Sequence, residues 1–115
     1  MYRIRKIDFR EVNGYDRLGY FIYDSDKEEP GDLESGYTGE GVVVKKELGK
    51  YFIKKAAGFY NVGYSVGFKT NEHMATEFAE YYADNLMENL MDKKKLYYYD
   101  KSEKKRKLEK VLAEQ

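Results

Sequence analysis

The chain contains no cysteine and no tryptophan, and only one proline and one histidine. Without cysteine it can form no disulfide and offers no thiolate to a metal ion, which fits a reducing cytoplasm. A metal site that needs two histidines is excluded as well. No apolar run approaches the length of a membrane span, and the charged N-terminus is unlike the apolar part of a signal peptide. We therefore expect a cytoplasmic protein that does not contact a membrane.

The chain also lacks a net charge, because 21 Lys and Arg side chains balance 21 Asp and Glu side chains. Its overall charge therefore gives no argument for nucleic acid or for an anionic membrane. Aromatic residues are abundant, with 13 tyrosines among 115 residues. This length and apolar content predict one domain with a single core, and the tyrosines predict hydroxyl groups at its edge and on contact surfaces.

The first half of the chain reads as β-structure. Residues 2–10 predict a strand, in which a change of parity near Arg5 and Lys6 indicates a bulge or a twist. The turn signal Asn13-Gly14 leads to a second strand at about residues 17–23. Residues 1–23 are thus expected to form a hairpin.

Three further apolar segments predict the rest of the sheet, starting at Val42, at Tyr51 and at Phe59. The second of them either stops near Gly58 or bends there into the third. The last of these, residues 59–68, alternates large residues with small ones. Because glycine on one face of a strand allows close approach, Gly63 and Gly67 are expected to face backbone or the helix that follows.

Residues 71–92 predict one long amphipathic helix with Asn71 as its N-cap and Lys93–Lys95 at its end. Apolar residues recur at spacing four in two adjacent rows, one starting at Met74 and the other at Ala75. We expect the larger side chains of the first row to pack on the sheet, namely Met74, Phe78, Tyr82 and Leu86. The opposite face is acidic, with Glu77, Glu80, Asp84 and Glu88.

The predicted fold class is α+β: an antiparallel sheet of four to five strands, one long helix packed on one face and a short C-terminal helix. Residues 1–95 would form the domain, and residues 96–115 a basic, tyrosine-rich extension. Ser102 can cap the short helix. Its apolar stripe is narrow, so it needs a surface to pack on, either its own domain, a second copy of the chain or a target.

An acidic loop is the first candidate binding segment. Residues 24–41 form a long polar connection, and long loops are often functional or mobile. Its carboxylates suit a basic partner, or the mimicry of a phosphate backbone, while a merely solvated loop is the structural alternative. The candidate residues are Asp24, Asp26, Glu28, Glu29, Asp32 and Glu34.

The basic C-terminal segment is the second candidate. Cationic side chains beside aromatic rings suit nucleic acid or an acidic protein surface. In the structural alternative, the tyrosines pack on the sheet and the lysines keep a surface helix soluble. The candidate residues are Lys93, Lys94, Lys95, Tyr97, Tyr98, Tyr99, Lys104, Lys105, Arg106 and Lys107.

Catalytic and metal motifs are weak by comparison. Asp24-x-Asp26-x-Glu28 begins like a calcium loop, but Glu29 stands where glycine is needed and Ser35 where a bidentate glutamate is needed. His73 has no nucleophile that the sequence places beside it. We therefore predict no catalytic residue, no metal and no cofactor.

The sequence favours a small non-enzymatic binding or inhibitor protein that acts through a protein partner. Its three charge blocks, an acidic loop, an acidic helix face and a basic tail, suit an accessory or inhibitor protein of the kind that phages and mobile elements encode. Two alternatives stay open. One is a nucleic-acid-binding module that uses the basic tail, and the other is a small-ligand binder or enzyme with a pocket between sheet and helix. A homodimer through the tail is a further expectation.

Overall fold

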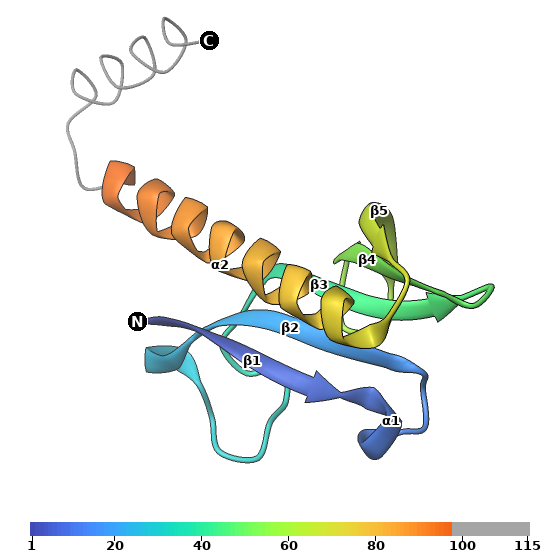
Figure 1. Ribbon diagram of the computed structural model, residues 1–115. Helices are drawn as coiled ribbons and strands as arrows, with labels where there is room; N and C mark the ends of the chain where they lie inside the picture. Colours follow the sequence, from blue (N-terminus) through green and yellow to red (C-terminus); the bar gives the residue numbers. More distant parts are fainter. Residues whose placement is uncertain (98–115) are drawn as a thin grey trace, which may run out of the picture.

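The computed structural model describes the backbone of residues 1–97 and the side chains of residues 1–92. Within this range a five-stranded antiparallel sheet carries one long helix on one face (Figure 1). The predicted fold class is confirmed for these elements, whereas the predicted C-terminal helix lies outside the described residues. The strands are β1 (Tyr2–Asp8), β2 (Arg17–Asp24), β3 (Tyr37–Glu47), β4 (Lys50–Ala56) and β5 (Val62–Lys69). The helices are α1 (Phe9–Val12), the 3-10 turn η1 (Ser25–Lys27) and α2 (Glu72–Tyr97).

The strands follow one another in space in the order of the sequence, so that β1 and β5 form the two edges. Local connections explain this order. The β3–β4 hairpin turns through Leu48 and Gly49, both with positive φ, as a two-residue hairpin turn of type I′ requires. Leu48 takes this uncommon conformation at the exposed tip of the hairpin.

The helix face of the sheet, which faces α2, holds the first core. Leu18, Tyr20, Val42, Val44 and Ile53 pack there against the alanine row Ala75, Ala79 and Ala83. The start of α2 is capped as predicted, because the Met74 amide donates to the Asn71 Oδ1 at 2.9 Å. Small alanine side chains let the helix backbone lie close to the sheet.

The expectation that the larger row packs on the sheet is wrong for its first two members. Met74 is 40% exposed and Phe78 is 39% exposed, whereas the three alanines are fully buried. Tyr82 and Leu86 are partly buried beside the alanines. The two rows are adjacent on the helix, and the row that permits closest approach occupies the centre of the contact. The larger side chains then flank the contact.

The outer face, which is the face of the sheet opposite α2, holds a second core rich in aromatic rings. Phe9, Phe21, Tyr23 and Phe59 are buried there, and the rings of Phe21 and Phe59 stack with centroids 4.4 Å apart. Phe59 lies before β5, in the connection that crosses this face. The prediction that residues 59–61 belong to the strand is therefore wrong.

This second core also explains the parity change in the N-terminal segment. Ile4 packs in the first core, while Ile7 and Phe9 pack in the second. The β1–β2 register runs without a shift, so the predicted bulge at Arg5 and Lys6 is wrong. The pattern changes because the two ends of the segment serve opposite faces of the sheet.

One register shift lies between β2 and β3, at Phe21 and Tyr23, and two more lie between β4 and β5. The β4–β5 register shifts between Ile53 and Lys54, and again between Lys54 and Ala56. A Cβ on Gly63 would lie 2.9 Å from the Lys55 carbonyl oxygen, and one on Gly67 would lie 3.7 Å from the Tyr82 hydroxyl oxygen. The expected close approach is thus confirmed at Gly63, while Gly67 faces α2 at an ordinary contact distance.

Helix α2 runs farther than predicted. It continues through Lys93–Lys95 to Tyr97, so those lysines do not end it. Its later turns project beyond the edge of the sheet (Figure 1).

Candidate functional site

Several carboxylates of the predicted acidic loop have structural partners. Asp24 is buried, and its Oδ1 accepts from the Asp26 amide and lies 3.4 Å from the N-terminal amine. Asp26 forms an ion pair of 2.6 Å with the same amine. Glu28 forms an ion pair with Arg5, whose guanidinium lies 4.1 Å from the centre of the Tyr23 ring.

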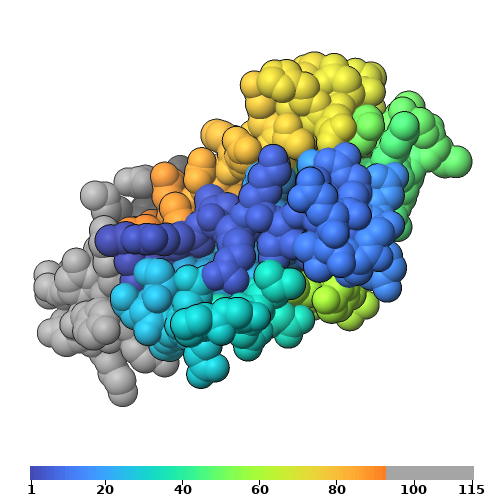
Figure 2. Space-filling model, turned by 90° about the horizontal axis from the view of Figure 1, so that it is seen from below, coloured from blue at the N-terminus to red at the C-terminus, as the bar shows by residue number. Residues whose placement is uncertain are grey.

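The rest of this segment is also tied to the sheet. Arg5 donates to the carbonyls of Asp32 and Leu33 at 3.4 and 3.3 Å, and the Tyr23 hydroxyl also donates to Leu33. The Asp32 carboxylate accepts from the Glu34 amide at 2.9 Å. Residues 37–41 belong to β3, so the connection is shorter than the predicted 24–41 loop. Figure 2 shows this segment, in cyan, beside β1.

A surface groove of about 540 Å³ lies between Arg5 and this loop. Its cation, Arg5, pairs with Glu28, and the carboxylates of Glu29 and Asp32 also line it. Of the six candidate carboxylates, only Glu29 and Glu34 make no ion pair and accept no hydrogen bond among the interactions of the described residues. The loop therefore offers a partner less free negative charge than its composition suggests.

The candidates in the C-terminal segment cannot be placed in the same way. The backbone of Lys93, Lys94, Lys95 and Tyr97 belongs to α2, but their side chains lie outside the described residues. The other candidates, Tyr98, Tyr99, Lys104, Lys105, Arg106 and Lys107, lie entirely outside them. Binding by this segment stays a prediction.

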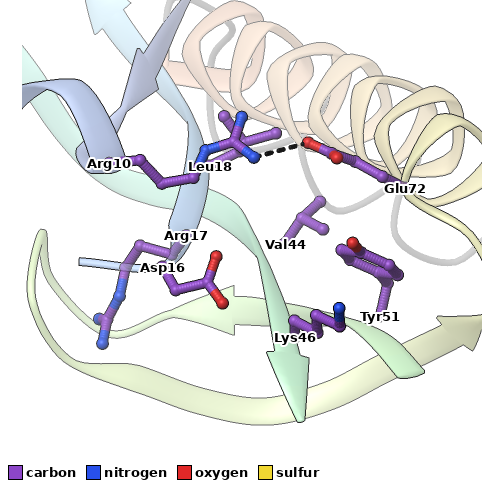
Figure 3. Close-up of a pocket in the computed structure, with 8 residues that line it drawn as sticks. All are labelled: Arg10, Asp16, Arg17, Leu18, Val44, Lys46, Tyr51 and Glu72. Atoms are coloured by element: carbon purple, nitrogen blue, oxygen red, sulfur yellow. Dashed lines mark hydrogen bonds and ion pairs between the residues drawn. The ribbon is translucent and has the colours of Figure 1, made fainter. Parts of the chain in front are cut away.

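A small cavity lies near the start of α2, where the alternative of a pocket between sheet and helix would place a ligand (Figure 3). Its volume is about 10 Å³, which is at the lower limit for one water molecule. Two of its charged side chains, Arg10 and Glu72, form an ion pair of 2.9 Å with each other. The Arg17 side chain points away from the cavity (Figure 3). This cavity does not offer room for an organic ligand. It is lined by Arg10, Asp16, Arg17, Leu18, Val44, Lys46, Tyr51 and Glu72.

The ion pairs beside this cavity hold secondary structure together. Asp8 caps α1 by accepting from the Arg10 amide, and its carboxylate pairs with the Arg10 guanidinium at 2.9 Å. These hydrogen bonds from Arg10 hold the pKa of Asp8 below its ordinary value. Arg10 thereby connects α1 to the first turn of α2 through Glu72.

A different surface emerges on the outer face at β3–β5. We call it the lysine–aromatic surface and define it by Lys45, Lys50, Phe52, Lys54 and Phe68. Neighbouring strands place Lys45 opposite Phe52, and Phe52 opposite Phe68. Directly paired residues point to the same face, and this face is the one opposite Ile53 and Val44, which pack under α2.

Rings and cations alternate closely on this surface. The Phe52 and Phe68 rings have centroids 6.2 Å apart, with the Lys54 ammonium 5.8 Å from the first ring and the Lys50 ammonium 5.6 Å from the second. Phe68 is 55% exposed. Tyr64, farther along the same edge strand, is 68% exposed. An edge strand thus presents aromatic rings to solvent beside positive charge.

Glu47 is the carboxylate that lies among these lysines. Its Oε1 accepts from Lys54 at 2.8 Å and lies 3.3 Å from the Lys45 ammonium. The hydrogen bond from Lys54, with help from Lys45, holds the pKa of Glu47 below its ordinary value. One carboxylate shared by two lysines leaves the surface with a net positive charge.

Arg17 extends the row by one more strand. It lies opposite Lys45 in the register, so the row Arg17, Lys45, Phe52 and Phe68 crosses β2 to β5. Its guanidinium donates to the Tyr60 carbonyl at 3.1 Å and lies 5.3 Å from the centre of the Tyr15 ring. Tyr15 and Tyr60 are about half exposed, at 50% and 51%.

The sequence carries a signal for this surface that the patterns within single segments do not reveal. Residues 42–69 contain six lysines, six aromatic residues and one carboxylate. A count of charge by segment would have shown this bias. The pairing of Lys45, Phe52 and Phe68 needed the strand register, which the spacing of residues within one strand does not supply.

The acidic residues of α2 lie on the opposite side of the molecule. Glu77, Glu80, Asp84 and Glu88 are exposed, as the amphipathic pattern predicted. His73 is exposed and lies 3.1 Å from the Glu77 carboxylate, one helical turn away. In the described part of the chain, no group of three or more potential ligands is arranged to hold a metal ion. No helix in that part is long and apolar enough to cross a membrane.

Comparison of the chain with protein-family models, with curated proteins and with solved structures finds no match.

Proposed function

We propose that the chain is a non-enzymatic binding protein that holds an anionic macromolecule on the lysine–aromatic surface. The observation that carries this proposal is the clustering of Lys45, Lys50 and Lys54 around two rings, on a part of the sheet that no other element of the described residues covers. Binding needs complementary charge and exposed contact area, and this surface supplies both.

The charge of the surrounding molecule strengthens the attraction. Residues 1–41 carry ten carboxylates against six cations, and residues 70–92 carry six carboxylates and no Lys or Arg. An anionic partner is repelled by those regions and attracted to β3–β5. Such segregated charge raises the association rate and orients the partner.

The neighbouring faces are occupied by the protein itself. α2 covers the helix face, and Phe9 and Phe59 cover the aromatic core of the outer face. The acidic loop is held by Arg5 and Tyr23. No other element of the described residues covers the part of the outer face at β4 and β5, so this part can contact a partner.

Retention on immobilised heparin, a sulfated polyanion, tests this proposal. We expect the triple variant Lys45→Gln, Lys50→Gln, Lys54→Gln to elute at clearly lower salt than the wild-type chain. A matched control removes the same charge from the tail by Lys104→Gln, Lys105→Gln, Lys107→Gln. Thermal unfolding followed by circular dichroism verifies that both variants are folded.

The two triple variants separate the proposal from its main competitor. A large loss for the sheet variant and a small one for the tail variant supports binding on β3–β5. The reverse result would place the binding segment in the tail, as the sequence alone suggested. Equal small losses would show that neither cluster acts as a defined polyanion site.

A further inference from the structure

We infer that the anionic partner is single-stranded nucleic acid, whose bases stack on Phe52 and Phe68 while its phosphates pair with the lysines beside them. This inference rests on the proposed function and adds the chemical class of the partner.

The two rings form a platform of suitable chemistry. Their centroids are 6.2 Å apart on neighbouring strands, and the ring planes are inclined by 40°. Adjacent bases of an extended strand can each stack on one ring, because every base has an aromatic face and stacking tolerates any sequence. Proteins that bind single strands combine such rings with a positively charged groove.

The lysines lie beside the rings, where the sugar–phosphate backbone of a stacked strand would pass. The Lys50 ammonium lies 5.6 Å from the Phe68 ring centre, and the Lys54 ammonium lies 5.8 Å from the Phe52 ring centre. Lys45 is the register partner of Phe52. The row from Arg17 to Phe68 crosses four strands, which is roughly 14 Å at the usual strand spacing. This is enough for a few nucleotides.

Two observations favour nucleic acid over an acidic protein. Lysine is depleted in protein–protein interfaces, and all three cations around the Phe52–Phe68 pair are lysines. An extended peptide could instead pair with the free edge of β5, but two register shifts interrupt that strand. Bulges of this kind disturb the regular edge that strand addition requires.

Fluorescence anisotropy with labelled oligo-dT and oligo-U of about 15 nucleotides tests the inference. The double variant Phe52→Leu, Phe68→Leu removes the rings but keeps apolar side chains. The matched control is Phe78→Leu, because Phe78 is also a partly exposed ring with a lysine, Lys69, 3.7 Å from its centre. That ring lies on α2, away from the lysine–aromatic surface.

Relative to the wild-type chain, we expect the Phe52/Phe68 variant to bind the single strand with a dissociation constant about fivefold higher or more. The Phe78 variant should bind with an unchanged dissociation constant. The Lys45/Lys50/Lys54 variant should bind more weakly and show a shallower salt dependence. A duplex of the same length should bind more weakly than the single strand, because its bases are already stacked.

Three results would overturn the inference. If the surface lysines govern heparin retention but single strands do not bind and the chain does not self-associate, the partner is an acidic protein, and the proposed function stands. If single strands bind equally well to the Phe52/Phe68 and Phe78 variants, the rings do not stack on bases. If single strands do not bind and sedimentation shows self-association that the lysine variant abolishes, the occupant is the acidic α2 face of a second copy.

Discussion

At the scale of single residues, Tyr20 and Tyr23 show how burial and hydrogen bonding act separately. Both are buried, and burial raises the pKa of each hydroxyl to about 12. The Tyr23 hydroxyl donates to the Leu33 carbonyl, whereas the Tyr20 hydroxyl has no hydrogen-bond partner among the described residues. A buried polar group without a partner opposes folding, and one with a partner supports it.

We therefore expect Tyr20→Phe to leave the free energy of unfolding unchanged or to increase it. Tyr23→Phe should decrease it by about 1 kcal/mol, because it removes a hydrogen bond that anchors residues 28–36. Urea unfolding of the two variants measures the difference. A larger loss for Tyr20→Phe than for Tyr23→Phe would contradict the assignment of partners.

Asp8 predicts a dependence of stability on pH. Hydrogen bonds from Arg10 lower its pKa from an ordinary value of 3.8 in the folded state. Its stabilisation is therefore fully present above that ordinary value, and it is lost as the pH falls through the lower, folded-state pKa.

Asp8→Asn keeps an acceptor for the cap of α1 but removes the charge. At neutral pH we expect a loss below about 1 kcal/mol, since the pair with Arg10 is partly exposed. Between pH 5 and pH 2 the variant should lose less stability than the wild-type chain. Parallel acid-unfolding curves for the two proteins would show that Asp8 does not contribute.

At the scale of secondary-structure elements, the position of α2 depends on its alanine row. Ala79 is fully buried against the sheet, and Phe78 is 39% exposed beside Lys69. Ala79→Leu should reduce the free energy of unfolding by about 1–3 kcal/mol or more, because the added atoms separate helix and sheet. Phe78→Ala should cost less than the roughly 3–5 kcal/mol of a fully buried phenylalanine. Thermal or urea unfolding in which Phe78→Ala is the more damaging change would mean that the larger row faces the sheet.

The irregular strand β5 provides a second comparison at this scale. Gly63→Ala places a methyl group 2.9 Å from the Lys55 carbonyl oxygen, and backbone cannot easily move away. We expect a loss of about 1–3 kcal/mol there. Gly67→Ala meets the Tyr82 hydroxyl at 3.7 Å and should be nearly neutral. Similar melting temperatures for the two variants would remove the argument for close strand approach at Gly63.

At the scale of the whole molecule, local sequence signals predicted where the helix and the strands lie. They predicted the contacts between these elements less well. The N-cap Asn71 and the spacing of apolar residues located α2, and the alternation of apolar residues located the strands. The choice between the alanine row and the Phe78 row depended on how closely the helix approaches the sheet. Spacing along the helix does not contain that distance.

The second core escaped prediction for a related reason. Phe59 continues an alternating pattern with β5, but it leaves the strand to stack on Phe21 from β2. The lysine–aromatic surface likewise combines residues from three strands, β3 to β5. Both features arise from contacts between distant segments, which the pattern within one segment does not specify.

Positive and negative side chains are concentrated in different segments of the chain, and the proposed binding surface lies in a segment rich in lysine. The loop and α2 carry most of the carboxylates, while residues 42–69 carry six lysines and one carboxylate. Attraction at residues 42–69 and at the basic tail, with repulsion at the loop and at residues 70–92, should make binding to a polyanion strongly dependent on salt.

The most direct test of this account is a titration of the isotope-labelled full chain with oligo-dT, followed by amide chemical shifts in NMR spectra. We predict that the largest changes occur in β4 and β5, around Phe52, Lys54 and Phe68, with small changes at residues 28–36 and along the exposed face of α2. Changes confined to the acidic loop or to residues 93–115, with β4 and β5 unaffected, would contradict the central claim that the lysine–aromatic surface is the binding site.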